Sequence, residues 1–226
     1  MSDLVDSDLP SEPTRASVAV AVPLGIVVGI FGISFGVLAA GTPAFGPAAA
    51  LFMSAATFAG SAQFATLTVI AAGGQALPAI LAAILLNLRY LPIGISVAPS
   101  LHGGFVRRFL QAQLIVDESW AVSARPGGRF DARVLVIAGL ILYVAWVFGT
   151  AVGLVTGQAL GDPRALGLDG AFPALFLALL VPHLRTRRAV ASAVIGGLIA
   201  VALLPFTPSG VPIIAAASAA LIGLRR

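Results

Sequence analysis

The sequence predicts an all-α integral membrane protein, a polytopic helical bundle of seven or eight membrane segments. Three observations support this prediction. Of the 226 residues, 59% are hydrophobic and only 10% are charged, whereas soluble domains are about half apolar and a quarter charged. The mean hydropathy is +1.04. Finally, the apolar residues form runs of about 20, the length that crosses a bilayer core, between arginines or Pro/Gly breaks.

An acidic tail precedes the first apolar run. It contains Asp3, Asp6, Asp8 and Glu12, together with Pro10 and Pro13. Secretory signal peptides begin with basic residues, so this tail has the opposite charge. We expect residues 1–17 to be a disordered cytoplasmic tail and residues 18–226 to form a single transmembrane domain.

Eight apolar segments follow the tail. They are Val18–Ala40, Phe45–Ala72, Ala76–Ala98, Phe105–Ala124, Val134–Gly157, Gly170–Leu184, Ala189–Phe206 and Val211–Leu224. The fourth is the weakest because Gln111, Gln113, Asp117 and Glu118 interrupt it. The eighth is short for a crossing, which a membrane accommodates by local thinning. The count is therefore seven or eight, depending on whether the fourth segment crosses.

The first and fifth segments share a pattern of small residues. Gly25, Gly29, Gly32 and Gly36 in the first, and Gly149, Gly153 and Gly157 in the fifth, recur at spacings that let two helix backbones approach closely. Phe31–Leu38 also aligns with Phe148–Val155, and Pro47–Phe52 resembles Pro173–Phe176. Internal duplication, which is common in secondary transporters, is one explanation. Chance similarity between Ala/Gly/Leu-rich helices is the other.

Arginine placement predicts the orientation, since cytoplasmic loops carry an excess of basic residues. With eight crossings, nine arginines share the side of the N terminus and three lie opposite. The nine are Arg15, Arg125, Arg129, Arg133, Arg185, Arg187, Arg188, Arg225 and Arg226, and the three are Arg107, Arg108 and Arg164. Both termini are then cytoplasmic. If the fourth segment only dips into the membrane, the C terminus stays cytoplasmic and the N terminus lies outside.

Arg89 is a charged residue near the middle of the third segment. An arginine at a helix centre costs about 2.5–3.5 kcal/mol on insertion scales, so another group must offset this cost. It lies too far from either end of the segment to reach the interface easily. Two readings remain open and are compatible: a structural pair with a carboxylate on another helix, or a site for an anionic group such as a substrate carboxylate.

Asp117 and Glu118 are the carboxylates that we expect to face Arg89. A carboxylate at membrane depth can carry a proton or hold a substrate ammonium. Neighbouring residues on a helix point about 100° apart, so one of the two at most faces a given site. A solvated amphipathic stretch at the interface is the alternative for this segment.

A Gly-Ser pair at Gly60 and Ser61 predicts a break or kink in the second segment. A half-helix that starts at such a break offers unpaired N–H groups and a partial positive charge to a carboxylate. Gln63 and Asn87 would then supply hydrogen bonds to the ligand. Bonds between helices are the competing role for Ser61 and Gln63.

Several classes of function are excluded. The chain has no cysteine, so it has no disulfides, thiolate metal sites or cysteine nucleophiles. It also lacks an H-E-x-x-H motif and a histidine near the buried acids, which argues against an enzyme. His102 and His183 stand alone at segment edges, so we expect no metal and no cofactor. The arginines punctuate apolar runs and do not form the basic face of a nucleic-acid partner.

A family resemblance emerges from the order of these motifs. Gly60-Ser61-Ala62-Gln63-Phe64, Asn87-Leu88-Arg89-Tyr90, Ala98-Pro99, Asp117-Glu118 and Leu166–Ala174 follow one another along the chain. In this order and spacing, they resemble the AzlC family of branched-chain amino acid exporters. The resemblance extends from about Val18 to the C terminus.

The resemblance implies an exporter of leucine, isoleucine and valine, and sometimes methionine, in a bacterial inner membrane. It also implies coupling to the proton gradient and a small partner subunit of the AzlD type. Tyr90 stands where many relatives carry histidine, so Asp117 or Glu118 is the expected titrating group. The alternatives are a transporter of another small amphiphilic solute and a structural or assembly subunit that does not transport.

Overall fold

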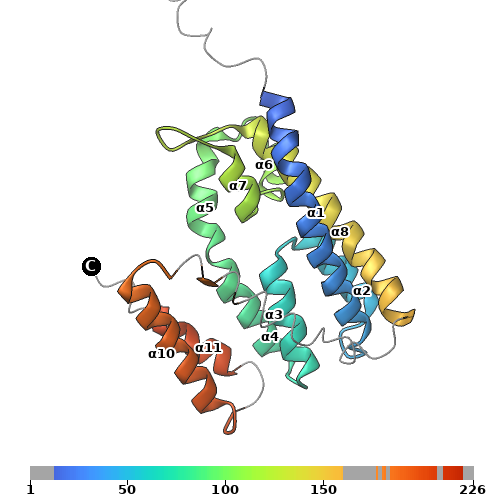
Figure 1. Ribbon diagram of the computed structural model, residues 1–226, viewed down its shortest axis with the longest axis vertical. Coiled ribbons are helices and arrows are strands. Elements are labelled where there is room, and N and C mark those ends of the chain that lie inside the picture. Colours follow the sequence, from blue (N-terminus) through green and yellow to red (C-terminus); the bar gives the residue numbers. More distant parts are fainter. Residues whose placement is uncertain (1–12, 160–176, 178–179, 182–183, 208–210, 221–226) are drawn as a thin grey trace, which may run out of the picture.

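The computed structural model describes residues 13–159, 177, 180–181, 184–207 and 211–220 of a helical membrane protein (Figure 1). Its α-helices are α1 (Pro13–Ala40), α2 (Pro47–Ala56), α3 (Gly60–Ala71), α4 (Ala76–Asn87), α5 (Tyr90–Val97), α6 (Phe105–Ala112), α7 (Asp117–Ser123), α8 (Ala132–Ala159), α10 (Arg187–Leu203) and α11 (Val211–Ala217). Two 3-10 turns, η1 (Ala98–Ser100) and η4 (Ser218–Ala220), and a two-stranded ribbon of β1 (Ala124–Arg125) and β2 (Arg129–Phe130) complete the described elements.

Helices α1 and α8 correspond to the first and fifth predicted segments. Their apolar parts, Ala19–Ala40 and Ala132–Gly157, are each long enough to cross a membrane. The two helices lie side by side in the same direction (Figure 1), because Gly25 lies against Ile141 and Gly157 lies against Val37. They form a tightly packed pair along one side of the molecule (Figure 1).

Glycine allows α1 and α8 to touch backbone to backbone. A Cβ atom on Gly32 would come within 2.6 Å of the Trp146 carbonyl oxygen, so no larger residue fits there. The contacts are reciprocal: Gly32 lies against Trp146 and Thr150, while Gly149 lies against Gly29 and Ile33. These are equivalent positions in the alignment of the two segments. Any two parallel helices packed in register give such reciprocity, so duplication and chance similarity both remain open, and Pro173–Phe176 lies outside the described residues.

The second predicted segment is broken, and the break precedes Gly60. Helix α2 ends at Ala56 and α3 begins at Gly60. Between them Phe58 has a φ of 43°, a left-handed conformation that is uncommon for a bulky residue. The carbonyl groups at the end of α2 are satisfied by side chains, since Gln113 donates to Ala56 O over 2.9 Å and Tyr143 to Ala55 O over 2.9 Å. Neither half is long enough to cross alone.

The third segment is bent as well, which the sequence analysis did not predict. Helices α4 and α5 meet at an angle of 42°, and Leu88 and Arg89 lie in the turn between them. Pro92, in the first turn of α5, is the local cause because it has no N–H to bond the Leu88 carbonyl and its ring crowds that group. If the pair is counted as one span, it is the third candidate crossing in the described part of the chain.

The fourth segment, expected as one crossing over 105–124, is instead two short helices. Helix α6 has eight residues and α7 has seven, so each is about 10–12 Å long and cannot span a core of roughly 30 Å. The link between them packs closely on α8, where Gly139 lies directly against Leu114. The count of seven or eight segments is therefore not confirmed: the fourth predicted segment is not a single helix, the second is broken as expected, and most of the sixth lies outside the described residues.

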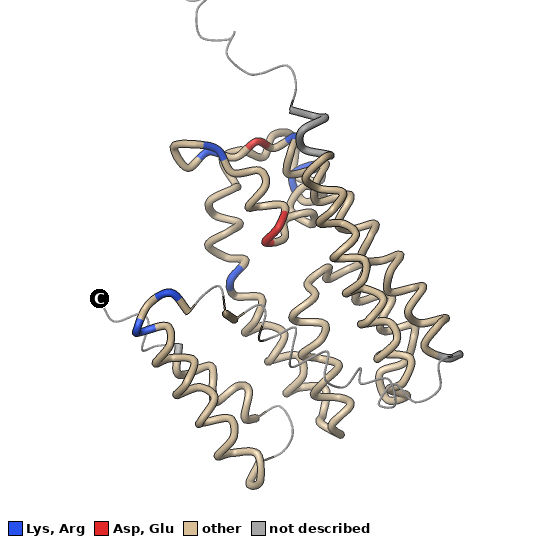
Figure 2. The backbone as a smooth tube through the Cα atoms, viewed as in Figure 1, with Lys and Arg blue, Asp and Glu red and all other residues tan. Residues whose placement is uncertain are grey.

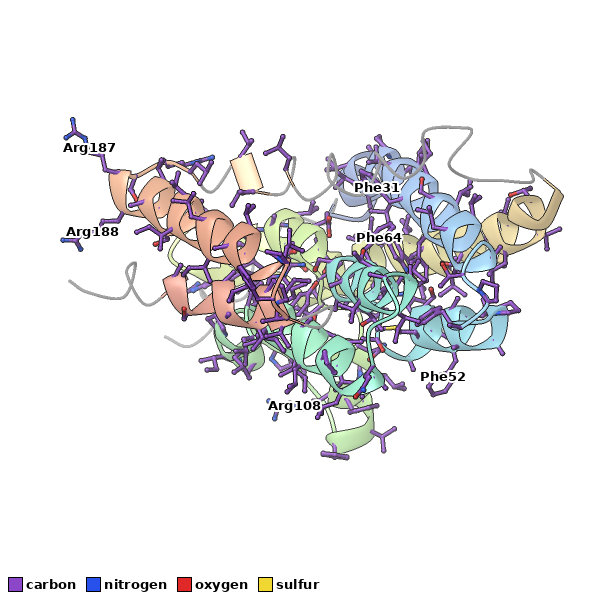
Figure 3. All side chains as sticks on the ribbon, turned by 90° about the horizontal axis from the view of Figure 1, so that it is seen from below. Phe31, Phe52, Phe64, Arg108, Arg187 and Arg188 are labelled. Atoms are coloured by element: carbon purple, nitrogen blue, oxygen red, sulfur yellow. The ribbon has the colours of Figure 1, made fainter. Side chains whose placement is uncertain are left out.

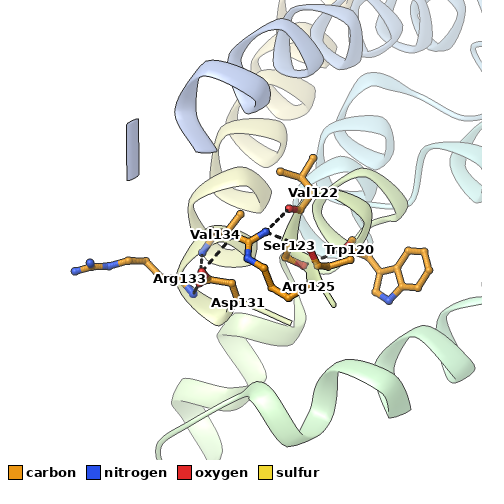
Figure 4. Close-up of polar contacts among 8 residues, drawn as sticks. Trp120, Val122, Ser123, Arg125, Asp131, Arg133 and Val134 are labelled. Carbon is orange, nitrogen blue, oxygen red and sulfur yellow. Dashed lines mark hydrogen bonds and ion pairs between the residues drawn. The ribbon is translucent and has the colours of Figure 1, made fainter. Parts of the chain in front are cut away.

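A hairpin joins α7 to α8 and starts the long helix (Figure 4). Ala124 pairs with Phe130 and Arg125 with Arg129 in the antiparallel ribbon. Asp131 then caps α8, since its carboxylate accepts hydrogen bonds from the N–H groups of Arg133 (3.0 Å) and Val134 (3.1 Å). Arg125 approaches the same carboxylate at 3.3 Å.

The C-terminal part contains α10 and α11, which pack together and lie beside α4 (Figure 1). Helix α10 has 17 residues and covers most of the seventh predicted segment. Helix α11 has only seven residues and covers the start of the eighth. The acidic tail up to residue 12 and nearly all of the sixth segment, with His183 and the Leu166–Ala174 motif, lie outside the described residues.

The outer surface of the bundle is apolar. Ile26 on α1, Ile80 on α4, Ile95 on α5 and Phe148 on α8 are among many exposed aliphatic and aromatic side chains, which suits a lipid environment. Charged residues gather at the end of the bundle where α1, α6 and the hairpin lie, and others stand farther down, where α4 meets α5, where α7 begins and around the start of α10 (Figure 2). The charges at the α4–α5 turn and at the start of α7 belong to the functional site.

Candidate functional site

The site is a pocket at the level where the helices are interrupted. It lies where α3 begins, where α4 turns into α5 and where α7 begins, with α1 and α8 as its back wall. The cavity has a volume of about 100 Å³, which is room for several waters or a small solute. Its lining residues are Val28, Phe31, Phe58, Gly60, Ser61, Phe64, Arg89, Tyr90, Val116, Asp117, Glu118, Leu142 and Trp146.

Arg89 is the cationic group of the pocket. Its Nη2 atom lies 3.0 Å from Asp117 Oδ2 and donates to Ser61 Oγ over 2.9 Å. The guanidinium also lies over the Tyr90 ring, 5.1 Å from the ring centroid, in a cation–π contact. The turn between α4 and α5 places Arg89 at the pocket. There the cation contacts Ser61 of α3, Tyr90 of α5 and Asp117 of α7.

Asp117 and Glu118 are the first two residues of α7. Ser119, fully buried, fixes the start of this helix: its hydroxyl accepts a hydrogen bond from Val116 N (2.9 Å) and donates to Leu114 O (2.8 Å). Carboxylates at a helix start are stabilised by the positive end of its dipole. Both acids line the pocket, and Asp117 is the one that contacts Arg89.

Gly60 and Ser61 form the first turn of α3, which also faces the pocket. The first N–H groups of any helix lack partners inside it, so this turn carries a partial positive charge. Gly60 has no side chain because Trp146 stands directly against it; a Cβ atom would come within 2.9 Å of the indole ring. The predicted break thus brings a helix start and a hydroxyl to the pocket.

Gln63 and Asn87 do not line the pocket. Gln63 is fully buried behind it and donates to Ser54 Oγ over 2.8 Å, and Ser54 in turn bonds Thr150 Oγ1 over 2.9 Å. This chain of hydrogen bonds ties α2, α3 and α8 together, which matches the role of bonds between helices. Asn87 ends α4, and its buried Oδ1 atom has no hydrogen-bond partner among the described residues.

Trp146 is a site residue that the sequence analysis missed. Its ring stacks on Phe35 at 6.1 Å and meets Phe64 edge to face at 6.1 Å. Its buried Nε1 atom has no hydrogen-bond partner in the described part of the chain, and neither has Arg89 Nε. Unpaired buried donors are costly, so both are candidates to bond a ligand. The only signal in the sequence was that one of its two tryptophans lies inside an apolar segment.

The rest of the wall is apolar. Phe31 from α1 and Phe64 from α3 lie on neighbouring parts of the bundle, whereas Phe52 points outward from α2 (Figure 3). Val28 and Leu142 add aliphatic surface to the pocket, and Phe58 packs edge to face on Tyr143 at 5.1 Å. The pocket therefore has both charged and apolar lining residues.

The pocket thus combines a cation, a helix start and two carboxylates with aromatic and aliphatic side chains. Five of the seven site residues expected from the sequence, Gly60, Ser61, Arg89, Asp117 and Glu118, are brought together here.

Comparisons with known proteins give a consistent family. The family model described as AzlC protein matches residues 23–160. An uncharacterized membrane protein of Archaeoglobus fulgidus is 38% identical over 188 residues, 82% of this chain and 82% of that protein. The inner membrane protein YgaZ of Escherichia coli is 27% identical over 174 residues, 70% and 69% of the two chains. An uncharacterized membrane protein of Helicobacter pylori is 25% identical over 178 residues, 77% of each. No solved structure matches.

Proposed function

The chain belongs to the AzlC family of membrane proteins, and we propose from this that it is a secondary transporter that exports branched-chain amino acids. The substrates would be leucine, isoleucine and valine, with methionine as a further candidate. Export would be driven by the proton gradient and would require a small membrane subunit of the AzlD type. The protein would lie in the bacterial inner membrane, where the name of the Escherichia coli relative places that protein.

The observation that carries this proposal is the pairing of Arg89 with Asp117 beside an apolar wall. Their N–O distance is 3.0 Å, and each side chain keeps over a third of its surface exposed, 36% and 39%. Such a pair is accessible to a ligand. A zwitterion can replace the pair because its carboxylate and its ammonium together satisfy both partners.

In this mechanism the substrate carboxylate takes the place of Asp117 at Arg89. Ser61, the first turn of α3 and the unpaired Arg89 Nε and Trp146 Nε1 groups add donors around that carboxylate. The released carboxylate of Asp117, or that of Glu118, then holds the substrate ammonium or takes up a proton. The branched side chain packs against Phe31, Phe64 and Leu142.

Gln63 and Asn87 act from behind the pocket in this proposal. Gln63 holds the start of α3 through Ser54 and Thr150, so it positions Ser61 and does not need to touch the substrate. Asn87 stands two residues before Arg89 with an unpaired buried oxygen. It can bond the ligand only if the turn between α4 and α5 changes shape during transport.

The arginines support an orientation. Six of the seven arginines in residues 13–159 lie in the elements at one end of the bundle, namely Arg15, Arg107, Arg108, Arg125, Arg129 and Arg133. By the positive-inside rule we assign this end, and the N terminus beside it, to the cytoplasm. The C terminus remains assigned to the cytoplasm from the sequence alone.

An export assay in cells tests the proposed function. Cells that make the protein and its small partner subunit are loaded with leucine, and efflux is measured. Arg89→Ala should abolish efflux while membrane insertion, checked by immunoblotting, is unchanged. Arg187→Ala, which removes an outward-pointing arginine at the start of α10 (Figure 3), should export normally. Efflux by Arg89→Ala at the level of the unmodified protein would remove Arg89 from the substrate site.

A non-transporting assembly subunit is the second candidate, and the same ion pair favours it. Arg89 and Asp117 satisfy each other without a ligand, as a purely structural pair would. Efflux measured with this chain alone, with the small subunit alone and with both separates the two. If this chain is only an assembly subunit, the purified chain should bind no leucine under any condition.

A further inference from the structure

Helix α6 has two chemically different faces. Phe105, Val106, Phe109 and Leu110 are 84%, 68%, 61% and 59% exposed. These positions fall on one side of a helix, and Arg107, Arg108 and Gln111 fall on the other. The Phe105 and Phe109 rings stack at 6.5 Å on the apolar side. No other α-helix in the described part of the chain places exposed large apolar groups on one face and two arginines on the opposite face within eight residues.

Neighbouring contacts hold α6 at the end of the bundle. Arg108, in the middle of α6, donates to Ala98 O in η1 over 3.3 Å. Just past the end of α6, Gln113 donates to Ala56 O at the end of α2 over 2.9 Å. These two contacts fix the helix to the body of the protein, while its apolar face is left without a protein partner among the described residues.

The charge at this end of the bundle is positive. Arg125 is neutralised by Asp131, but Arg107, Arg129 and Arg133 form no ion pair with the described residues. The apolar spans of α1 and α8 begin near this end, at Ala19 and Ala132. At that level, an exposed apolar face can contact the acyl chains of a bilayer, and arginines without an ion pair can contact its anionic headgroups.

We propose that α6 lies flat in the membrane interface and binds an anionic phospholipid headgroup through Arg107 and Arg108. Its phenylalanines and aliphatic side chains enter the outer part of the acyl chains, as in other amphipathic interfacial helices. The arginine stems lie along the boundary, and their guanidinium forks bond the lipid phosphate. The assigned partner is phosphatidylglycerol of the same leaflet. This inference does not rest on the transport function.

Spin labels test the position of α6. The chain has no cysteine, so single cysteines can be introduced without removing others. In nanodiscs of phosphatidylcholine and phosphatidylglycerol, labels at Phe109→Cys and Leu110→Cys should be accessible to oxygen and protected from a water-soluble nickel chelate. A label at Arg107→Cys, an exposed position on the opposite face, should show the reverse. Labels at 109 and 110 that are open to the nickel chelate, or shielded from both quenchers as in a protein interface, would overturn the proposal.

Lipid preference tests the headgroup. The affinity of the purified protein for fluorescent phosphatidylglycerol is measured against that for phosphatidylcholine in mixed micelles. Arg107→Gln with Arg108→Gln should lower the preference by about fivefold for each arginine lost. Arg185→Gln with Arg187→Gln removes the same charge from the segment that leads into α10 and should keep the preference. An equal loss in both double variants would mean non-specific attraction by net charge, and no loss in the first would exclude α6 as the headgroup site.

Discussion

Single residues decide how the pocket is held together. Arg89 depends on Asp117, Ser61 and Tyr90, and each comes from a helix end. A hydrogen bond to a charged group contributes about 1.5–3 kcal/mol, so the loss of one contact should weaken the site without destroying it.

Ser61→Ala removes one acceptor from Arg89 and a hydroxyl from the pocket. We expect the apparent affinity for leucine in a transport assay to fall about tenfold, because the guanidinium is less firmly held. Ser34→Ala is the matched control, since the Ser34 hydroxyl bonds only the Ile30 carbonyl of its own helix in the described structure. Equal affinities in the two variants would show that Ser61 does not position Arg89.

Thr150→Val tests the buried polar chain behind the pocket. The exchange keeps the shape of the side chain but leaves Ser54 without one partner at a fully buried position. We expect the free energy of unfolding to fall by about 1–2 kcal/mol, measured by denaturant titration in detergent. In Thr156→Val, which alters an exposed threonine bonded within α8, the loss should be smaller.

At the scale of elements, the close contact of α1 and α8 defines the bundle. Gly153→Ala would bring a methyl group within 2.9 Å of Gly36 Cα. We expect the two helices to move apart and the protein to lose about 1–3 kcal/mol of stability, seen as a lower melting temperature in detergent. Gly94→Ala, where a Cβ meets nothing within 4 Å, should melt at the same or a higher temperature. Similar losses in both would contradict tight packing at Gly153.

The sequence predicted some elements well and others poorly. Helices α1 and α8 and the break before Gly60 followed from hydropathy, glycine spacing and the Gly-Ser pair. The bend at Leu88 and Arg89 was missed, although Pro92 was its visible local signal. The two helices of the fourth segment depend on long-range contacts, such as Gln113 with the end of α2 and Leu114 with Gly139, which no local pattern encodes.

The site was predicted in the same uneven way. Arg89, Asp117 and Glu118 stood out because charges are costly in an apolar segment. Gln63 stood out as a polar amide in an apolar segment, yet it bonds Ser54 behind the pocket. The position of Trp146 in the pocket could not be predicted from the sequence. Its place opposite Gly60 is set by how α8 packs on α3 and not by its own neighbours in the chain.

For the whole molecule, two interrupted segments change the path of the chain through the membrane. In residues 13–159 only α1, the bent pair α4 and α5, and α8 are candidates to cross. The turn before α4 and the hairpin before α8 then lie at opposite ends (Figure 1). The same arrangement places α1, α6 and the hairpin at the arginine-rich end.

Cysteine accessibility tests this path. In intact cells, Gln75→Cys, in the exposed turn before α4, should react with a membrane-impermeant maleimide from outside. Pro126→Cys, in the exposed hairpin turn, should react only after the cells are opened. Reaction of both from the same side would contradict the three-crossing path for residues 13–159.

Counterflow in proteoliposomes tests the central claim, that the pocket around Arg89 binds and carries an amino acid. Vesicles containing the protein and its small partner are filled with unlabelled leucine, and entry of labelled leucine is followed with and without a proton gradient. We predict entry for the unmodified protein and for Arg187→Gln, and none for Arg89→Gln. Entry at an unchanged rate with Arg89→Gln, or no entry with the unmodified protein, would contradict the account.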